Sequence, residues 1–229
     1  DSTKSLSFTL SANATLVNGD VTARNFERVH ITAGQGNDTL TAGNLADDLN
    51  GMAGNDTLKG LGGDDKLTGW YGADTILGGD GDDTIWGSGG IKDTHADRLY
   101  GEGGDDLITM NVSDYASGGS GADRVVVDFS EETFGVSFVF SNSLVKVNAN
   151  TSFTGMEAID FLGGSGNDTV TGGTDVDYLD GAAGNDTLRG GTADDFLVDG
   201  KGNDKLYGDT GNDIFTRYLD EVGTDYFHG

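Results

Sequence analysis

Aspartates recur every nine residues in two parts of this chain of 229 residues. Between Gly51 and Trp86, each aspartate ends a six-residue segment that has glycine at its first and fourth positions. Glycine reaches positive φ without a Cβ penalty, so these segments predict tight turns with exposed backbone carbonyls. Carboxylate and carbonyl oxygens are ligands for hard cations, so the pattern favours cation binding at the turns. The two series are Asp38, Asp47, Asp56, Asp65, Asp74 and Asp83, then Asp168, Asp177, Asp186, Asp195, Asp204 and Asp213.

The charge balance also indicates a cation as partner. The chain has 39 acidic residues against 13 lysines and arginines, a formal net charge of -26. Such a chain repels itself unless cations bind, and it excludes a general affinity for nucleic acid or an anionic membrane. Cysteine is absent, which excludes disulfides and thiolate zinc sites. No apolar run approaches the length of a membrane span, so we expect none.

Motifs for catalysis are missing from the sequence. The histidines His30, His95 and His228 are isolated, and no H-E-x-x-H segment of a zinc protease occurs. No G-x-S-x-G segment marks a hydrolase nucleophile. The acidic repeat accounts for nearly all carboxylates without the paired acids of a glycosidase. We therefore expect the chain not to be an enzyme.

The elements that position the aspartates are very short strands. Each aspartate precedes three residues with an aliphatic residue in the middle, as in Thr57-Leu58-Lys59. This alternation predicts a strand whose aliphatic side chain points inward, and repeated turns and strands predict a solenoid with one shared core. A disordered acidic linker has no reason to keep such a pattern. The inward residues are Leu40, Leu49, Leu58, Leu67, Ile76 and Ile85, then Val170, Leu179, Leu188, Leu197, Leu206 and Phe215.

Insertions and one short repeat interrupt the nine-residue register. Five residues are inserted around 91–95, after which the pattern resumes at Asp97 and Asp106. The repeat at Asp114 is one residue short, and three residues are inserted before Asp225. The cation partners of Asp97, Asp114 and Asp225 therefore stay unassigned.

A longer repeat of 130 residues contains the short one. Without a gap, Leu6-Ser7-Phe8 aligns with Val136-Ser137-Phe138, and the segment GNDTL at Gly54 aligns with the same letters at Gly184. Alternating residues before each block predict lead-in strands. We expect two tandem modules: residues 1–130, with lead-in 1–32 and repeats 33–126, and residues 131–229, with lead-in 131–162 and repeats 163–229.

Units such as GLGGDDKLT and GGDGDDTIW resemble the hemolysin-type repeats-in-toxin (RTX) calcium-binding nonapeptide family. The resemblance implies an all-β fold, a right-handed parallel β-roll (β-solenoid) in two tandem blocks, with Ca²⁺ between stacked turns. In the family, the lower turn provides its aspartate and the carbonyls of positions 2 and 4, and the upper turn its aspartate and the carbonyls of positions 1 and 3. Because strands alternate between two sheets, partner turns are eighteen residues apart.

The ligands that the resemblance implies come from both blocks, and they correspond to about eight or more calcium ions. Some depart from the family's glycine, among them Leu45, Asp175, Ala193 and Asp199, as does the neighbouring Trp70. In the first block they are Gly34, Gly36, Asp38, Gly43, Leu45, Asp47, Gly51, Met52, Ala53, Gly54, Asp56, Gly60, Leu61, Gly62, Gly63, Asp65, Gly69, Tyr71, Asp74, Gly78, Gly79, Asp80, Gly81, Asp83, Gly101, Gly103, Asp106 and Asp123. In the second block they are Gly164, Gly166, Asp168, Gly173, Asp175, Asp177, Gly181, Ala182, Ala183, Gly184, Asp186, Gly190, Gly191, Thr192, Ala193, Asp195, Asp199, Lys201, Asp204, Gly208, Thr210 and Asp213.

Two functions are consistent with these residues. The resemblance implies a calcium-binding RTX β-roll region of a larger secreted bacterial protein, exported by type I secretion machinery and folding on Ca²⁺ outside the cell or at its surface. The alternative is a calcium-dependent module that binds extracellular polysaccharide, as in an adhesin, a surface layer or an enzyme accessory module. Aromatic residues that could stack on sugar rings are Trp70, Tyr71, Trp86 and Tyr100.

Overall fold

The computed structural model describes residues 7–9, 28–90, 93–218 and 223–229. All secondary-structure elements in these residues are β-strands, and nearly all strand pairs are parallel. The predicted all-β parallel solenoid is therefore confirmed. Residues 1–6 and 10–27 of the predicted lead-in lie outside the described residues, as do residues 91–92 of the insertion. The chain divides into two compact units, Asp1–Asp123 and Arg124–Gly229, and each is described by itself.

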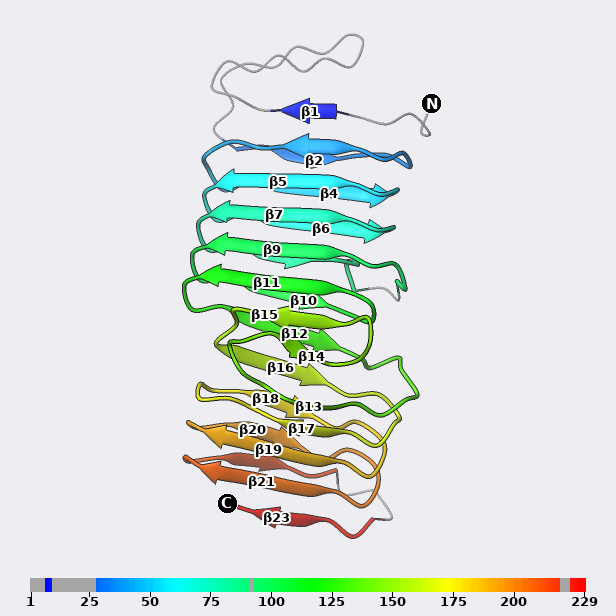
Figure 1. The fold of residues 1–229 in the computed structure, drawn as a ribbon, viewed down its shortest axis with the longest axis vertical. Helices are drawn as coiled ribbons and strands as arrows, with labels where there is room; N and C mark the ends of the chain where they lie inside the picture. Colours follow the sequence, from blue (N-terminus) through cyan, green and yellow to red (C-terminus); the bar gives the residue numbers. More distant parts are fainter. Residues whose placement is uncertain (1–6, 10–27, 91–92, 219–222) are drawn as a thin grey trace. The chain divides into compact units, whose positions relative to one another are not determined.

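In the first unit, successive strands alternate between two parallel sheets. Strands β5, β7, β9 and β11 run in one direction, and β4 and β6 behind them run in the other (Figure 1). One sheet contains, in order, β1 (Ser7–Thr9), β3 (Thr39–Thr41), β5 (Thr57–Gly62), β7 (Thr75–Asp80), β9 (Arg98–Gly103) and β11 (Tyr115–Ser120). The other contains β2 (His30–Thr32), β4 (Asp48–Ala53), β6 (Lys66–Tyr71), β8 (Thr84–Trp86) and β10 (Leu107–Met110).

The second unit repeats this arrangement and adds a hairpin. The antiparallel pair β14 (Val145–Lys146) and β15 (Ser152–Thr154) belongs to neither of its two parallel sheets. One sheet contains β12 (Arg124–Asp128), β16 (Ala158–Leu162), β18 (Tyr178–Asp180), β20 (Phe196–Val198) and β22 (Ile214–Thr216). The other contains β13 (Ser137–Val139), β17 (Thr169–Thr171), β19 (Thr187–Thr192), β21 (Lys205–Thr210) and β23 (Tyr226–His228).

The lead-in strands pair with the first repeats in the same register in both units. Ser7 in β1 is opposite Thr39 in β3, and Ser137 in β13 is opposite Thr169 in β17. The two residues of the second pair are each 130 residues later in the chain than those of the first, as in the long sequence repeat. The strands of a parallel sheet keep the same register from turn to turn. The lead-in strand therefore fixes the register of the first repeat in each block.

The aliphatic residues form the core, as the pattern predicts. Leu58 lies opposite Leu40 and Ile76, and each has 0% exposure. Ile76 in turn lies opposite Leu99, so the insertion at 91–95 leaves the register unchanged. Ala116 takes the core position of the short repeat with 0% exposure. The other predicted core residues with 0% exposure are Leu49, Leu67, Ile85, Val170, Leu179, Leu188, Leu197 and Leu206.

The last described turn is packed less tightly. Phe215 in β22, predicted as a core residue, is only half-buried. Its ring packs edge to face on Phe227 in β23, with 5.8 Å between the centroids. Neither ring has a further described strand beyond it. Burial in a solenoid is supplied by the neighbouring turn, so a terminal turn buries its side chains less.

Candidate metal centre

The aspartates of neighbouring turns form hydrogen-bonded columns. Oδ1 of Asp56 accepts a hydrogen bond from the backbone N–H of Asp38 (2.7 Å), and Oδ1 of Asp74 accepts one from Asp56 (2.7 Å). In the second unit, Oδ1 of Asp186 accepts the N–H of Asp168 (2.7 Å). Turns eighteen residues apart are thus neighbours, as the alternation of strands predicts.

The second carboxylate oxygen, Oδ2, is buried without a hydrogen-bond partner in most members of these columns. A buried carboxylate oxygen without a partner is costly, so each of them is a place for a cation or a proton. All the residues concerned are at most 2% exposed. They are Asp56, Asp65, Asp74, Asp83, Asp97, Asp106, Asp168, Asp186 and Asp195.

Glycine at the first turn position keeps space open around these oxygens. A Cβ atom at Gly181 would lie 2.6 Å from Oδ2 of Asp186 and 2.9 Å from the carbonyl oxygen of Asp199 in the next turn on that side. A carboxylate oxygen and a carbonyl oxygen therefore converge on one small space, and this donor set suits calcium. The same arrangement recurs at Gly51, Gly60, Gly69, Gly78, Gly101, Gly163 and Gly172.

The predicted carbonyl ligands at positions 2 and 3 accept hydrogen bonds between turns. The carbonyl of Gly34 accepts the N–H of Ala53 (3.2 Å), and the carbonyl of Tyr71 accepts the N–H of Gly54 (2.9 Å). A carbonyl has two lone pairs, so one remains for an ion. Other predicted ligands bonded in this way are Gly43, Asp80, Gly103, Gly164, Gly173, Ala182 and Lys201.

The carbonyls at position 4 lie beneath the fourth-position glycine of the next turn. Gly54 has a φ of 134°, and a Cβ atom there would collide with the carbonyl oxygen of Gly36. Only glycine suits such a place, because both the backbone conformation and the close approach exclude a side chain. The predicted ligands Gly36, Gly54, Gly63, Gly81, Gly166, Gly184 and Ala193 all have their carbonyls in this position.

Departures from glycine at position 2 are tolerated by the backbone. Met52, Leu61, Trp70 and Ala182 have φ values of 73°, 78°, 77° and 60°, in the left-handed region. Non-glycine residues are uncommon there and cost free energy. The turn therefore imposes its conformation on whichever residue occupies the position, and Trp70 does not interrupt the column.

Some predicted ligands differ from the rest. Oδ2 of Asp47 accepts a hydrogen bond from the N–H of Gly43 (2.9 Å), and its Oδ1 accepts one from the N–H of Val29. In the same way, Oδ2 of Asp177 accepts a hydrogen bond from the N–H of Gly173 (2.6 Å), and its Oδ1 accepts one from the N–H of Ile159. Oδ2 of Asp38 likewise accepts Gly34 (3.2 Å). In these turns, Oδ2 of the aspartate therefore accepts a hydrogen bond from a backbone N–H group of the same turn.

The predicted ligand residues with the most exposed side chains contribute through backbone position alone. Leu45 is 52% exposed, and a Cβ atom at Gly63 would collide with its backbone. The side chains of Asp175 and Thr210 are also exposed. No metal ligation by these side chains is expected. Of the other departures noted in the sequence, Asp199 is buried, with 1% exposure.

Burial raises the pKa values of several column aspartates. Desolvation raises the pKa of Asp56 to about 6, of Asp186 to about 7 and of Asp74 to about 8. The hydrogen bond from the preceding turn opposes this rise, and neighbouring carboxylates such as Asp38 add to it. Burial therefore favours the protonated form of these carboxyl groups, and a bound cation would favour the charged form.

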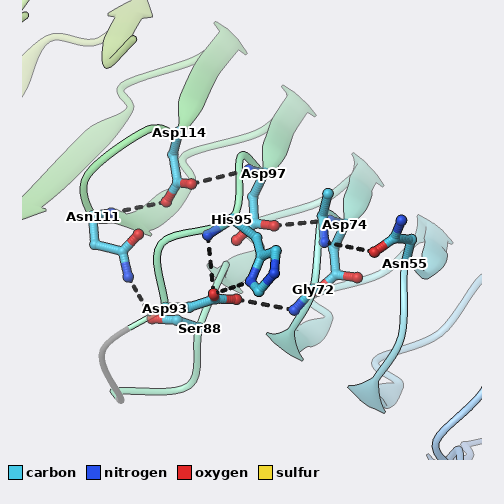
Figure 2. Close-up of polar contacts among 10 residues, drawn as sticks. Asn55, Gly72, Asp74, Ser88, Asp93, His95, Asp97, Asn111 and Asp114 are labelled. Carbon is cyan, nitrogen blue, oxygen red and sulfur yellow. Dashed lines mark hydrogen bonds and ion pairs between the residues drawn. The ribbon is translucent and has the colours of Figure 1, made fainter.

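The insertion brings further acidic residues to one column (Figure 2). Oδ1 of Asp97 accepts the N–H of Asp74 (2.8 Å), and Oδ1 of Asp114 accepts the N–H of Asp97 (3.0 Å), so the column continues through both irregular repeats. Oδ2 atoms of Asp97 and Asp114 lie 2.6 and 3.4 Å from the Cβ position of Gly87. Asp93 of the insertion accepts the N–H of Gly72 (3.0 Å).

Sequence reasoning left these residues unassigned because the register of nine fails there. The column brings Asp97 and Asp114 into line although they are 23 and 17 residues from their neighbours. The first-position carbonyls of Gly87 and Gly118 also lie beside Oδ2 of Asp74 and Asp106. The aliphatic residues Leu99 and Ala116 were the signal for this register, because core pairing fixes the turns. Within the described ranges, no group of three or more histidine or acidic side chains could hold a metal ion.

The family comparison agrees with the turn geometry. A family model described as the RTX calcium-binding nonapeptide repeat (4 copies) matches residues 30–44, 41–70, 71–90, 93–109, 160–188 and 189–216, more than half of the chain. The chain belongs to the RTX calcium-binding nonapeptide repeat family. Nonapeptide repeats of this RTX family bind calcium, and the column geometry suits that ion. The curated proteins include no match to the chain. In the described parts of this RTX chain, no helix is long and apolar enough to cross a membrane.

Proposed function

We propose that this chain is a calcium-responsive RTX β-roll region of a secreted bacterial protein, which folds when Ca²⁺ binds between its turns outside the cell. The buried Oδ2 atoms without hydrogen-bond partners are the observation that carries this proposal. An ion at each would neutralise carboxylates that otherwise repel one another along the column. The module is structural and not enzymatic, as is typical of the RTX β-roll.

Each ion would lie where Oδ2 of the lower aspartate meets the first-position carbonyl of the upper turn. The remaining ligands would be the predicted carbonyls of positions 2, 3 and 4 and the aspartate of the upper turn. Spaces of this kind occur on both sides of both units, so about eight or more ions are expected, each with six to eight oxygen ligands. We further propose the two tandem modules 1–130 and 131–229, which the equal pairing of β1 and β13 supports.

Calcium titration of the chain tests the proposal. Circular dichroism should show coil in excess chelator and β-structure after Ca²⁺ is added, because binding and folding are coupled. Isothermal titration calorimetry should count the ions, and Mg²⁺ at the same concentration is the control, since it demands stricter octahedral geometry. A chain that is fully β-structured in chelator and binds no calcium would contradict the proposal.

The extracellular location follows from the same linkage. Free calcium is low inside cells and high outside, so a chain of charge -26 would stay extended until it is exported. Export through type I secretion machinery fits this order of events. Secretion of a tagged chain should then depend on that machinery, and the secreted chain should gain protease resistance only in medium with calcium.

A second candidate function is binding to extracellular polysaccharide. Tyr207, Tyr226 and His228 form a row on β21 and β23, with 5.7 Å between the tyrosine rings and Arg189 4.0 Å above the Tyr207 ring. Tyr226 is 51% exposed and Tyr207 is half-buried, and aromatic rings of this kind can stack on sugar rings. A glycan array probed with the calcium-loaded chain tests this function, and binding that persists in Tyr207→Ala would argue against this row.

A further inference from the structure

The last described turn of the second unit contains an arginine directed at buried carboxylates. Arg217 follows β22, and its Nη2 lies 2.9 Å from Oδ2 of Asp225, whereas its Nε lies 4.0 Å from Oδ2 of Asp199. The side chains of Asp225 and Asp199 are only 4% and 1% exposed. A buried carboxylate that keeps its charge needs a cation at this distance, and the guanidinium provides one.

Asp225 is the next member of an aspartate column. Its Oδ1 accepts the N–H of Asp204 (3.2 Å), as Oδ1 of Asp204 accepts that of Asp186 (2.8 Å). Oδ2 of Asp168 and of Asp186 in this column is buried without a hydrogen-bond partner. At Asp225, the equivalent oxygen is paired with Arg217. The guanidinium therefore lies against the oxygen that elsewhere in the column faces the space for an ion.

Asp199 connects the arginine to the same turn. It occupies a first position where the family has glycine, and its Oδ1 accepts the N–H groups of Gly200 (2.7 Å) and Tyr218 (3.2 Å). Its carbonyl oxygen still lies beside Oδ2 of Asp186, at the space in front of Gly181. The departure from glycine thus leaves the preceding site intact and adds a carboxylate that faces Arg217.

The other arginine ion pairs in the described ranges are made with aspartates that are not column members. Arg124 pairs with Asp160 and Arg189 pairs with Asp209, and these carboxylates are 31% and 36% exposed. Pairs of this kind at a surface contribute little and are incidental to ion binding. Arg217 differs because both of its partners are buried.

We propose that Arg217 takes the place of a calcium ion at Oδ2 of Asp225, so that the last turn of this column closes with a resident cation. The inference rests on the proposed function, because it assumes that the other turns of the column bind calcium. A guanidinium stays protonated at all relevant pH values, so the contact is independent of the calcium concentration. The turn would keep its register at calcium levels too low to fill the other sites.

Calcium counting with matched variants of the full chain tests the inference. Bound calcium per chain is measured by equilibrium dialysis at saturating Ca²⁺ for the wild type, Asp225→Asn and Asp186→Asn. Asp225→Asn should leave the count unchanged, because that carboxylate faces arginine, while Asp186→Asn should lower it. A loss of one ion in Asp225→Asn would overturn the inference. A wild type that binds no calcium would instead refute the proposed function.

Removing the arginine should raise the number of bound calcium ions. Arg217→Gln should gain about one ion per chain, because Oδ2 of Asp225 then lacks a cation. The carboxylates of Asp225 and Asp199 are the kind of ligand that calcium prefers. Arg189→Gln is the matched control and should keep the wild-type count. An unchanged or lower count in a folded Arg217→Gln variant, checked by hydrogen exchange of residues 199–228, would overturn the inference. If that variant does not fold, the Asp225→Asn count still decides.

Discussion

Replacing Gly60 with alanine should remove one calcium site, whereas replacing Gly62 in the same turn should not. Neither glycine has a positive φ, so alanine strains the backbone at neither position. A Cβ atom at Gly60 would occupy the space between Oδ2 of Asp65 and the carbonyl oxygen of Gly78. A Cβ atom at Gly62 would have its nearest neighbour at 3.6 Å, an ordinary van der Waals contact.

The expected cost follows from the binding linkage. At free calcium about 100-fold above its Kd, one ion stabilises the folded chain by about 2.7 kcal/mol, and Gly60→Ala should lose about this amount. Gly62→Ala should be neutral or slightly stabilising, by about 0.5 kcal/mol, because alanine restricts the unfolded chain. The difference between the variants combines the lost ion with the steric cost of a Cβ atom against the carbonyl oxygen of Gly78, and the part of it that depends on the calcium concentration measures the site.

The assay is thermal unfolding of both variants over a range of calcium concentrations, together with the ion count. Gly60→Ala should bind about one ion fewer and show a weaker dependence of Tm on calcium, by the same linkage. Equal ion counts and equal Tm values for Gly60→Ala and Gly62→Ala would refute the assignment of the space in front of Gly60 as an ion site.

Three further outcomes are expected. Leu58→Ala should cost about 2 to 5 kcal/mol, as truncations of fully buried leucines do, and Thr57→Ala should be nearly neutral by chemical denaturation; equal losses would contradict the register. In chelator, any residual structure should decline as pH rises, because pKa values raised from 3.8 to about 6 to 8 mean that the folded chain holds protons that the unfolded chain has released. A pH titration by circular dichroism checks this sign, and greater stability at pH 8 than at pH 5 would contradict it. Asp186→Ala should lose about two ions and reduce hydrogen-exchange protection in residues 163–227 while leaving 33–126 protected, because repeats couple through neighbours. Uniform loss of protection would mean that the two proposed modules behave as one.

The sequence by itself determined the repeat, the core and the turn positions. Every repeat has equivalent neighbours, so the alternation at Leu58 had to recur at Leu40 and Ile76, and all three are fully buried. The same reasoning places the aspartates in columns, because strands that alternate between two sheets bring turns eighteen residues apart together. Local pattern and tertiary contact coincide in a solenoid, and this is why the prediction of fold class succeeded.

Only the tertiary structure decided what happens where the register of nine is broken. Asp97 and Asp114 rejoin their column because Leu99 and Ala116 keep their core positions. The contact of Arg217 with Asp225 joins two sides of an insertion, and no spacing rule relates these residues. Which carboxylate oxygens lack a partner also depends on whether a turn bonds to itself, as at Asp47, or leaves the space open, as at Asp65. These outcomes depend on contacts between neighbouring turns, which the pattern of one repeat does not contain.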